Sequence, residues 1–296
     1  MGAVSPKIYF LFYSGKDCLQ DWEKNLKMGD ADLDTSAKSE CAKARFRIGF
    51  LALHNFQYDL ALEMFEQAEE DEKAEIGRSY PMAMWGAAMA TMQILWQYSD
   101  CEKGKEFLKR IPEERDWITD KEKAYIETGY ALYPNDLDCG DDVQFHREKR
   151  FKDAMEKVVK KYPKETEASM FFAVASLAVS AQSKNTNTKV MKNIGNHLQS
   201  LEKRLPTHSG LLHYITHFYD TPKFYKMGNR RFLEKMIQPI DQKNHAASVG
   251  LRAARNYLKV ATSSCHGLHM PSHVFMRFGS WKESLQSNYL SIKVNL

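Results

Sequence analysis

The chain has 296 residues, of which 43% are hydrophobic and 27% are charged. This is the ordinary composition of a globular protein, and the length allows a large buried core in one domain or two. The net charge is only +4, and Lys and Arg are interleaved with Asp and Glu. We therefore expect no nucleic-acid partner. No apolar run approaches the roughly 20 residues of a transmembrane helix, so we expect no membrane partner either.

The five cysteines are far apart and form no C-x-x-C pair: Cys18, Cys41, Cys101, Cys139 and Cys265. Such spacing is typical neither of a zinc ribbon nor of a dense disulfide scaffold. Because their number is odd, at least one thiol stays unpaired, which favours a reducing compartment. The apolar run Ile8–Tyr13 is a little like a signal peptide, but it is short and no small-residue cleavage site follows cleanly. We therefore predict a cytoplasmic location.

Apolar residues recur at spacings of three and four along nearly the whole chain, which predicts an all-α protein without strands. Gly, Pro and Asn interrupt this pattern at short intervals, so we expect helices of about 10–20 residues joined by short loops. Residues Met82–Leu95 are apolar enough all round to form one buried helix. We predict an N-terminal segment over 1–35 and a single helical-repeat domain over 36–296.

The kind of repeat can be tested on the spacing of small and aromatic residues. A tetratricopeptide repeat requires Gly at position 8, Ala at 20, an aromatic residue at 24 and Ala at 27. With Gly49 at position 8, Ala61, Phe65 and Ala68 occupy the other three positions. The small residues let two antiparallel helices approach closely. The match predicts a tetratricopeptide-repeat-like solenoid of antiparallel helix pairs.

Two histidine pairs with H-x-x-x-H spacing stand near the C-terminus. They are His213 with His217 and His269 with His273, and His266 lies three residues before His269. Residues four apart share one face of a helix, with Cβ atoms about 5–6 Å apart. Two such imidazoles can share one metal ion. The alternative is that these histidines are packed or hydrogen-bonded side chains of a helix interface.

A second repeat register places three of these histidines on one helix. If Ser284 stands at position 20, then His266, His269 and His273 fall at positions 2, 5 and 9 of the first helix. That helix faces the concave ligand surface of a tetratricopeptide solenoid. Pro271 interrupts this stretch, and if a helix begins there the argument for a shared face weakens.

The other pair is expected on a first helix one repeat earlier, so both pairs would meet across one groove. Several imidazoles suit Zn, Cu, Fe or Ni better than Mg or Ca. A closed set of four ligands would be structural, whereas an open position could activate water or oxygen. Asp220 and Glu283 are carboxylates that could orient the imidazoles. Candidates for this supporting role or for substrate contact are Asp220, Tyr214, Tyr219, Met276, Arg277 and His245.

These motifs resemble a known family. The stretches His213–Asp220 (HYITHFYD), Gly250–Ala261 (GLRAARNYLKVA) and His266–Phe275 (HGLHMPSHVF) look like a largely uncharacterised tetratricopeptide-repeat family, best represented in bacteria. Its members carry H-Y-x-I-H-x-Y-D and H-x-x-H-M-P-x-H-I-F motifs. The resemblance implies the helical-repeat fold and places the family's histidines on all five histidines named above. It implies no activity.

The chain departs from that family by an insertion at about 223–247. The inserted segment is basic and aromatic and includes His245. Insertions in repeat proteins often cluster on a functional face, so we expect an extra helix or a lid near the histidine groove. The alternative is a tolerated surface elaboration.

Two functions follow from the sequence. The first is a metal-binding repeat protein, plausibly a metalloenzyme that acts on a small molecule in the concave groove. The second is a non-catalytic scaffold that binds a peptide or a partner protein in the same groove. The chain also stops soon after its last repeat helix without an obvious polar cap, which suggests either a truncated chain or self-association through the C-terminal end.

Overall fold

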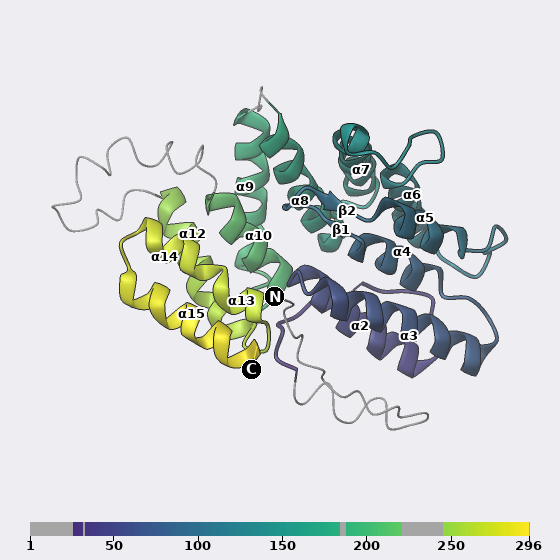
Figure 1. Cartoon of the computed structure of the whole chain (residues 1–296), viewed down its shortest axis with the longest axis horizontal. Helices are drawn as coiled ribbons and strands as arrows, with labels where there is room; N and C mark the ends of the chain where they lie inside the picture. Colours follow the sequence, from purple (N-terminus) through teal and green to yellow (C-terminus); the bar gives the residue numbers. More distant parts are fainter. Residues whose placement is uncertain (1–25, 32, 184–187, 221–244, 296) are drawn as a thin grey trace.

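The computed structural model describes residues 26–31, 33–183, 188–220 and 245–295 (Figure 1). The expected insertion therefore lies almost wholly outside the described residues, as do most of the N-terminal segment and the side chain of His245. The helices are α2 (Glu40–His54), α3 (Tyr58–Ile76), α4 (Pro81–Ala90), α5 (Cys101–Lys109), α6 (Asp120–Leu132), α7 (Asp141–Lys161), α8 (Thr166–Gln182), α9 (Thr188–Glu202), α10 (Ser209–Asp220), α12 (His245–Val260), α13 (Cys265–His269), α14 (Pro271–Arg277) and α15 (Trp281–Asn295). The protein is mostly helical, as predicted.

Helices α2 and α3 lie side by side and show how small residues set the packing (Figure 1). Ser39 caps α2, because its side chain accepts a hydrogen bond from the backbone N–H of Ala42. A Cβ atom at Gly49 would lie 3.1 Å from the ring of Phe65, and one at Gly86 would lie 2.6 Å from it. Glycine at these positions therefore lets α2, α3 and α4 pack closely around the fully buried Phe65.

The predicted helix Met82–Leu95 is wrong at its C-terminal end. Helix α4 stops at Ala90, and the chain forms an antiparallel hairpin of β1 (Met92–Gln93) and β2 (Tyr98–Ser99). The Thr91 hydroxyl hydrogen-bonds the carbonyl of Ala88 and the hydroxyl of Tyr133, while the Thr91 carbonyl accepts from the N–H of Asp100. These contacts to distant residues end the helix, and the apolar pattern of the segment carries no sign of them.

The described end of the N-terminal segment packs against the helices. Met28, Ala31 and Leu33 are buried in the main core. Asp30 forms a backbone bridge with His208, the residue directly before α10. This extended segment therefore helps to hold the N-terminal end of α10, the helix that carries two of the candidate histidines.

The cysteines differ from the sequence-based expectation. Cys101, at the start of α5, forms a disulfide with Cys139, and their Cα atoms are 5.4 Å apart. Cys41 is also disulfide-bonded, and Cys265 is a free thiol. Disulfides persist in oxidising compartments, so the bonded cysteines oppose the reducing compartment that the odd count favoured.

Among the described residues, we found no helix both long enough and apolar enough to cross a lipid bilayer.

Replacing Cys101 and Cys139 together by alanine should lower the free energy of unfolding by about 3–4 kcal/mol, because the bond closes a loop of 38 residues. Urea denaturation of the variant and the wild type under non-reducing conditions measures the difference. Cys265→Ala is the matched control, since it removes a thiol without opening a loop. A loss below about 1 kcal/mol in the double variant would show that the bond does not constrain the unfolded chain.

Candidate metal centre

Three helices bring the five histidines together. Helix α10 carries His213 and His217, α13 carries His266 and His269, and α14 carries His273. Pro271 does begin α14, but Met270 before it has helical dihedral angles (φ −55°, ψ −38°). The backbone therefore stays helical between α13 and α14, and the proline does not separate the histidines.

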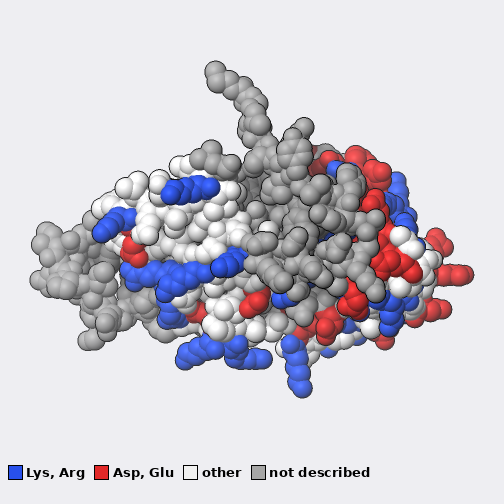
Figure 2. All heavy atoms as spheres, turned by 90° about the horizontal axis from the view of Figure 1, so that it is seen from below, with Lys and Arg blue, Asp and Glu red and all other residues white. Residues whose placement is uncertain are grey.

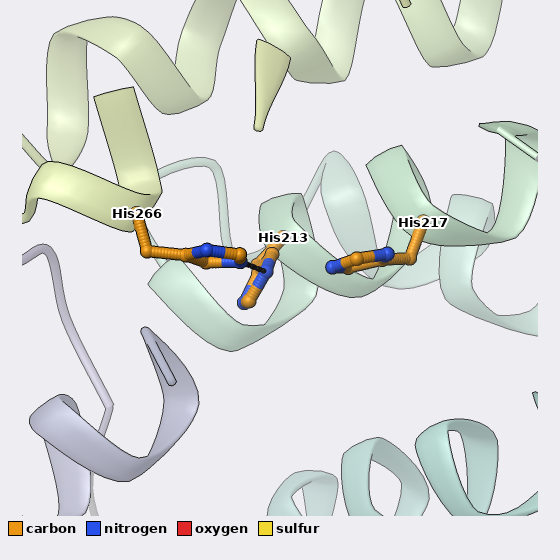
Figure 3. Close-up of side chains that lie close together, drawn as sticks. All are labelled: His213, His217 and His266. Carbon is orange, nitrogen blue, oxygen red and sulfur yellow. Dashed lines mark hydrogen bonds between the residues drawn. The ribbon is translucent and has the colours of Figure 1, made fainter. Parts of the chain in front are cut away.

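His213, His217 and His266 form a triad in which one ring nitrogen from each lies within 4.8 Å of the others. Figure 3 shows the rings of His217 and His266 approaching His213 from opposite sides. The Nε2 atoms of His213 and His266 are 3.1 Å apart. Two nitrogen ligands of a tetrahedral zinc ion, each at about 2.0–2.1 Å, are themselves about 3.3 Å apart. The His213–His266 distance therefore matches two ligands of one ion, and the nitrogen of His217, within 4.8 Å of both, is placed to supply a third.

The tautomer of His213 is fixed by the end of α2. Its Nδ1–H donates a hydrogen bond of 2.6 Å to the backbone carbonyl of His54, and a carbonyl can only accept. In the neutral ring, Nε2 therefore presents its lone pair toward His266. A backbone carbonyl behind a ligating histidine is the usual arrangement in protein metal sites.

His217 supplies an independent sign of a ligand. Its Nε2 atom is buried and has no hydrogen-bond partner among the described residues. An unsatisfied buried polar atom costs about 1–3 kcal/mol, so native proteins usually give it a partner. A metal ion between the three rings would be such a partner, and the residues present therefore fit one.

Burial also keeps the triad in its ligating, neutral form. Burial, followed by the neighbouring His217 and His266, holds the pKa of His213 well below its usual value. Burial and His266 lower the pKa of His217 to about 3, and burial and His269 lower the pKa of His266 to about 4. All three imidazoles are therefore neutral at pH 7, which is the form that binds metals.

A buried network behind the triad was not predicted from the sequence. Glu167 on α8 accepts hydrogen bonds of 2.9 Å from the Nε2 atoms of His54 and His208. His54 in turn accepts a hydrogen bond from the Tyr214 hydroxyl through Nδ1, at 3.0 Å. The network joins the ends of α2 and α10 to α8 and so positions the His54 carbonyl that orients His213. No local spacing reveals it, because His54 and Glu167 are 113 residues apart.

Aromatic rings cover one side of the triad. The ring centroid of Phe56 lies 4.3 Å from that of His213 and 5.5 Å from that of His266. Trp96, from the hairpin turn, lies 5.3 Å from Phe56 and 5.6 Å from His266. Phe56 has a φ of +56°, which is rare for a bulky residue and is kept only where packing requires it. These rings limit the access of water to the triad.

His269 and His273 form a second pair beside the triad. Their Nε2 atoms are 3.0 Å apart, and the ring of His269 lies 6.5 Å from that of His266. Asp220 accepts from His273 Nδ1 at 3.3 Å and also pairs with Arg277. The predicted supporting residues Asp220 and Arg277 therefore lie at this second pair.

The remaining predicted supporting residues lie elsewhere. Tyr214 is behind the triad, in the Glu167 network. Tyr219 packs against Gly250, between α10 and α12. Met276 is exposed, and Glu283 accepts two hydrogen bonds from Arg255 rather than one from a histidine. The side chain of His245 lies outside the described residues.

No family model, no curated protein and no solved structure matches this chain.

Proposed function

We propose that the chain is a tetratricopeptide-repeat-like solenoid that binds one transition metal ion through His213, His217 and His266. The close packing of α2 on α3 at Gly49 supports the repeat, because Ala61, Phe65 and Ala68 at the other pattern positions are fully buried. Relation to the bacterial tetratricopeptide-repeat family with the same histidine motifs is part of this proposal.

The main support for the proposed metal site is that three neutral imidazoles converge on one point. The Nε2 lone pair of His213 is fixed toward His266, and the buried Nε2 of His217 has no other partner among the described residues. A set of nitrogen donors suits Zn, Cu, Fe or Ni.

Three protein ligands leave a coordination position open, which is the pattern of catalytic rather than structural sites. A bound metal ion would supply an activated water molecule or a polarised substrate oxygen at that position. Phe56 and Trp96 would exclude bulk water from it, since their rings lie against His213 and His266. We therefore propose a metal-dependent enzyme, a hydrolase or an oxidoreductase, that acts on a small molecule.

Metal analysis of the purified full chain tests the proposal. The wild type should retain at least one equivalent of a transition metal, and His213→Ala and His217→Ala should each retain one equivalent less than the wild type. His146→Ala is the matched control, because His146 is exposed on α7, away from the triad. Less than about 0.2 equivalents in the wild type after reconstitution with Zn²⁺ would refute the metal site.

One observation supports the alternative function, a non-catalytic scaffold that binds a partner. Helix α15 exposes a row of apolar side chains: Trp281, Leu285, Tyr289 and Ile292 are 55–74% exposed. Their spacing places them along one side of the helix. Figure 2 shows that the surface on the side of the C-terminal helices is mostly uncharged or basic, while acidic groups gather at the opposite end. Exposed apolar rows of this kind often bind other proteins.

Self-association through α15 is the partner that we propose for this row. Light scattering should then give a mass larger than that of one chain, and Leu285→Asp should return it to one chain. Lys282→Asp, on the same helix, is the control for added negative charge. A wild type that remains one chain at high concentration would remove the support for self-association.

A further inference from the structure

The second histidine pair has hydrogen bonds that fix both of its rings. His269 Nδ1 lies 2.7 Å from Oδ1 of Asn288. The Asn288 amide N–H₂ donates to the carbonyl of Ser284 at 3.0 Å, so its orientation is determined and Oδ1 faces the histidine. An amide oxygen only accepts, and His269 therefore carries its hydrogen on Nδ1.

His273 is fixed in the same way by a carboxylate. Its Nδ1 atom lies 3.3 Å from Oδ2 of Asp220. The other oxygen of this carboxylate pairs with the guanidinium of Arg277. A carboxylate paired with arginine is ionised and only accepts hydrogen bonds, so His273 also carries its hydrogen on Nδ1.

Both neutral rings consequently direct the lone pairs of Nε2 at each other across 3.0 Å. Two lone pairs at this distance repel unless a cation lies between them. The distance is close to the roughly 3.3 Å between two nitrogen ligands of one tetrahedral ion. The histidine–carboxylate arrangement of His273 with Asp220 is moreover the usual support of a metal ligand.

We propose that His269 and His273 bind a second transition metal ion beside the triad, so that the centre holds two metals. This inference rests on the proposed function of the triad. Asp220 and Asn288 orient the two ligands, and Arg277 balances the charge of Asp220. The His273 side chain is 42% exposed, so water or a substrate oxygen can complete the coordination from the solvent side.

Titration of the metal-free full chain with Zn²⁺ alone tests this inference. The wild type should bind two equivalents, His269→Ala and His273→Ala should each bind one, and His217→Ala should also bind one. His146→Ala, with its exposed ring on α7, should still bind two. Circular dichroism checks that each variant is folded.

The number of Zn²⁺ ions bound distinguishes a failure of the second metal site from a failure of the triad. One equivalent in the wild type, retained in His269→Ala, would mean that a proton rather than a metal bridges the second pair, and would overturn this inference alone. Loss of all metal in His269→Ala would mean one ion shared by the five histidines, which also overturns it. No binding by the wild type would refute the triad as well.

The orienting role of Asn288 gives a second readout. Asn288→Ala leaves both ligands in place but frees the ring of His269, so the weaker Zn²⁺ affinity should fall about 10- to 100-fold while the triad affinity stays unchanged. Equal affinities in this variant and the wild type would contradict an Asn288-supported site.

The disulfide-bonded cysteines indicate the kind of cell compartment in which the chain folds. The Cys101–Cys139 disulfide and the bonded Cys41 lead us to infer that the chain folds in an oxidising compartment, rather than in the cytoplasm as the sequence suggested. Cys101 is buried, so its bond forms during folding and is protected afterwards. A cytosolic chain of this kind would instead be kept reduced by thiol buffers.

Thiol labelling in the cells that make the protein tests this inference. After acid quenching and denaturation without reductant, Cys265 should react with a maleimide, while Cys101, Cys139 and Cys41 should react only after reduction. Mass spectrometry of the labelled peptides identifies each site. Direct labelling of Cys101 and Cys139 without reductant would overturn the inference.

Discussion

Replacing Glu167 by alanine should lower the free energy of unfolding by about 3–5 kcal/mol, the usual loss when one partner of a buried charged network is removed. Burial raises the pKa of the Glu167 carboxyl, but His54 and His208 outweigh burial and lower it to about 2. The carboxylate is therefore ionised at pH 7, and its removal leaves two buried ring N–H groups without an acceptor. Urea denaturation at pH 7 measures the loss.

Glu156→Ala is the control for this variant. Glu156 forms a surface ion pair with Lys160 on α7, so its removal should cost less than about 1 kcal/mol. Glu167→Ala should also weaken Zn²⁺ binding by the triad about 10- to 100-fold, because the His54 carbonyl that orients His213 loses its support. If Glu167→Ala lost no more stability than Glu156→Ala, the Glu167 network would not stabilise the folded chain around the triad.

Lowering the pH from 7 to 5 should destabilise the metal-free chain by about 3–4 kcal/mol through His217 and His266 alone. Their folded pKa values, about 3 and about 4, lie below the ordinary value of 6.5. The unfolded chain therefore binds more protons as the pH falls below 6.5. The contribution of these two neutral rings to the free energy of unfolding is fully present above pH 6.5. It is lost as the pH falls from 6.5 toward their folded pKa values.

Denaturation of the metal-free chain at the two pH values, with a chelator present, measures this loss. The double variant His217→Gln/His266→Gln should lose about 3–4 kcal/mol less than the wild type between pH 7 and pH 5, because glutamine does not titrate. Equal losses in the variant and the wild type would mean that folding does not lower the pKa values of these two rings.

The helices and the histidine pairs were predictable because both depend on local spacing. Ser39 directly precedes α2 and caps it through the N–H of Ala42, three residues further on. His213 and His217 stand four residues apart on α10. Helix α4 was predicted too long, because its end depends on Tyr133 and Asp100. The proline at 271 was a justified doubt, and Met270 resolves it by keeping helical dihedral angles.

The surroundings of the site were not predictable, because they are assembled from distant segments. The Glu167 network joins residues from α2, α8 and α10, and the rings of Phe56 and Trp96 reach the triad from loops. The disulfide of Cys101 with Cys139 joins residues that are 38 positions apart, which no local spacing reveals. The sequence therefore predicted the histidines of the candidate site but not the residues that orient and cover them.

X-ray anomalous scattering at the absorption edge of the bound metal, on crystals of the full chain, shows whether the three histidines hold a metal ion. We expect an anomalous peak between His213, His217 and His266, at about 2.0–2.1 Å from one nitrogen of each ring if the metal is zinc. A metal-loaded crystal with no peak among these three rings, or with a peak that only oxygen ligands surround, would refute the three-histidine site.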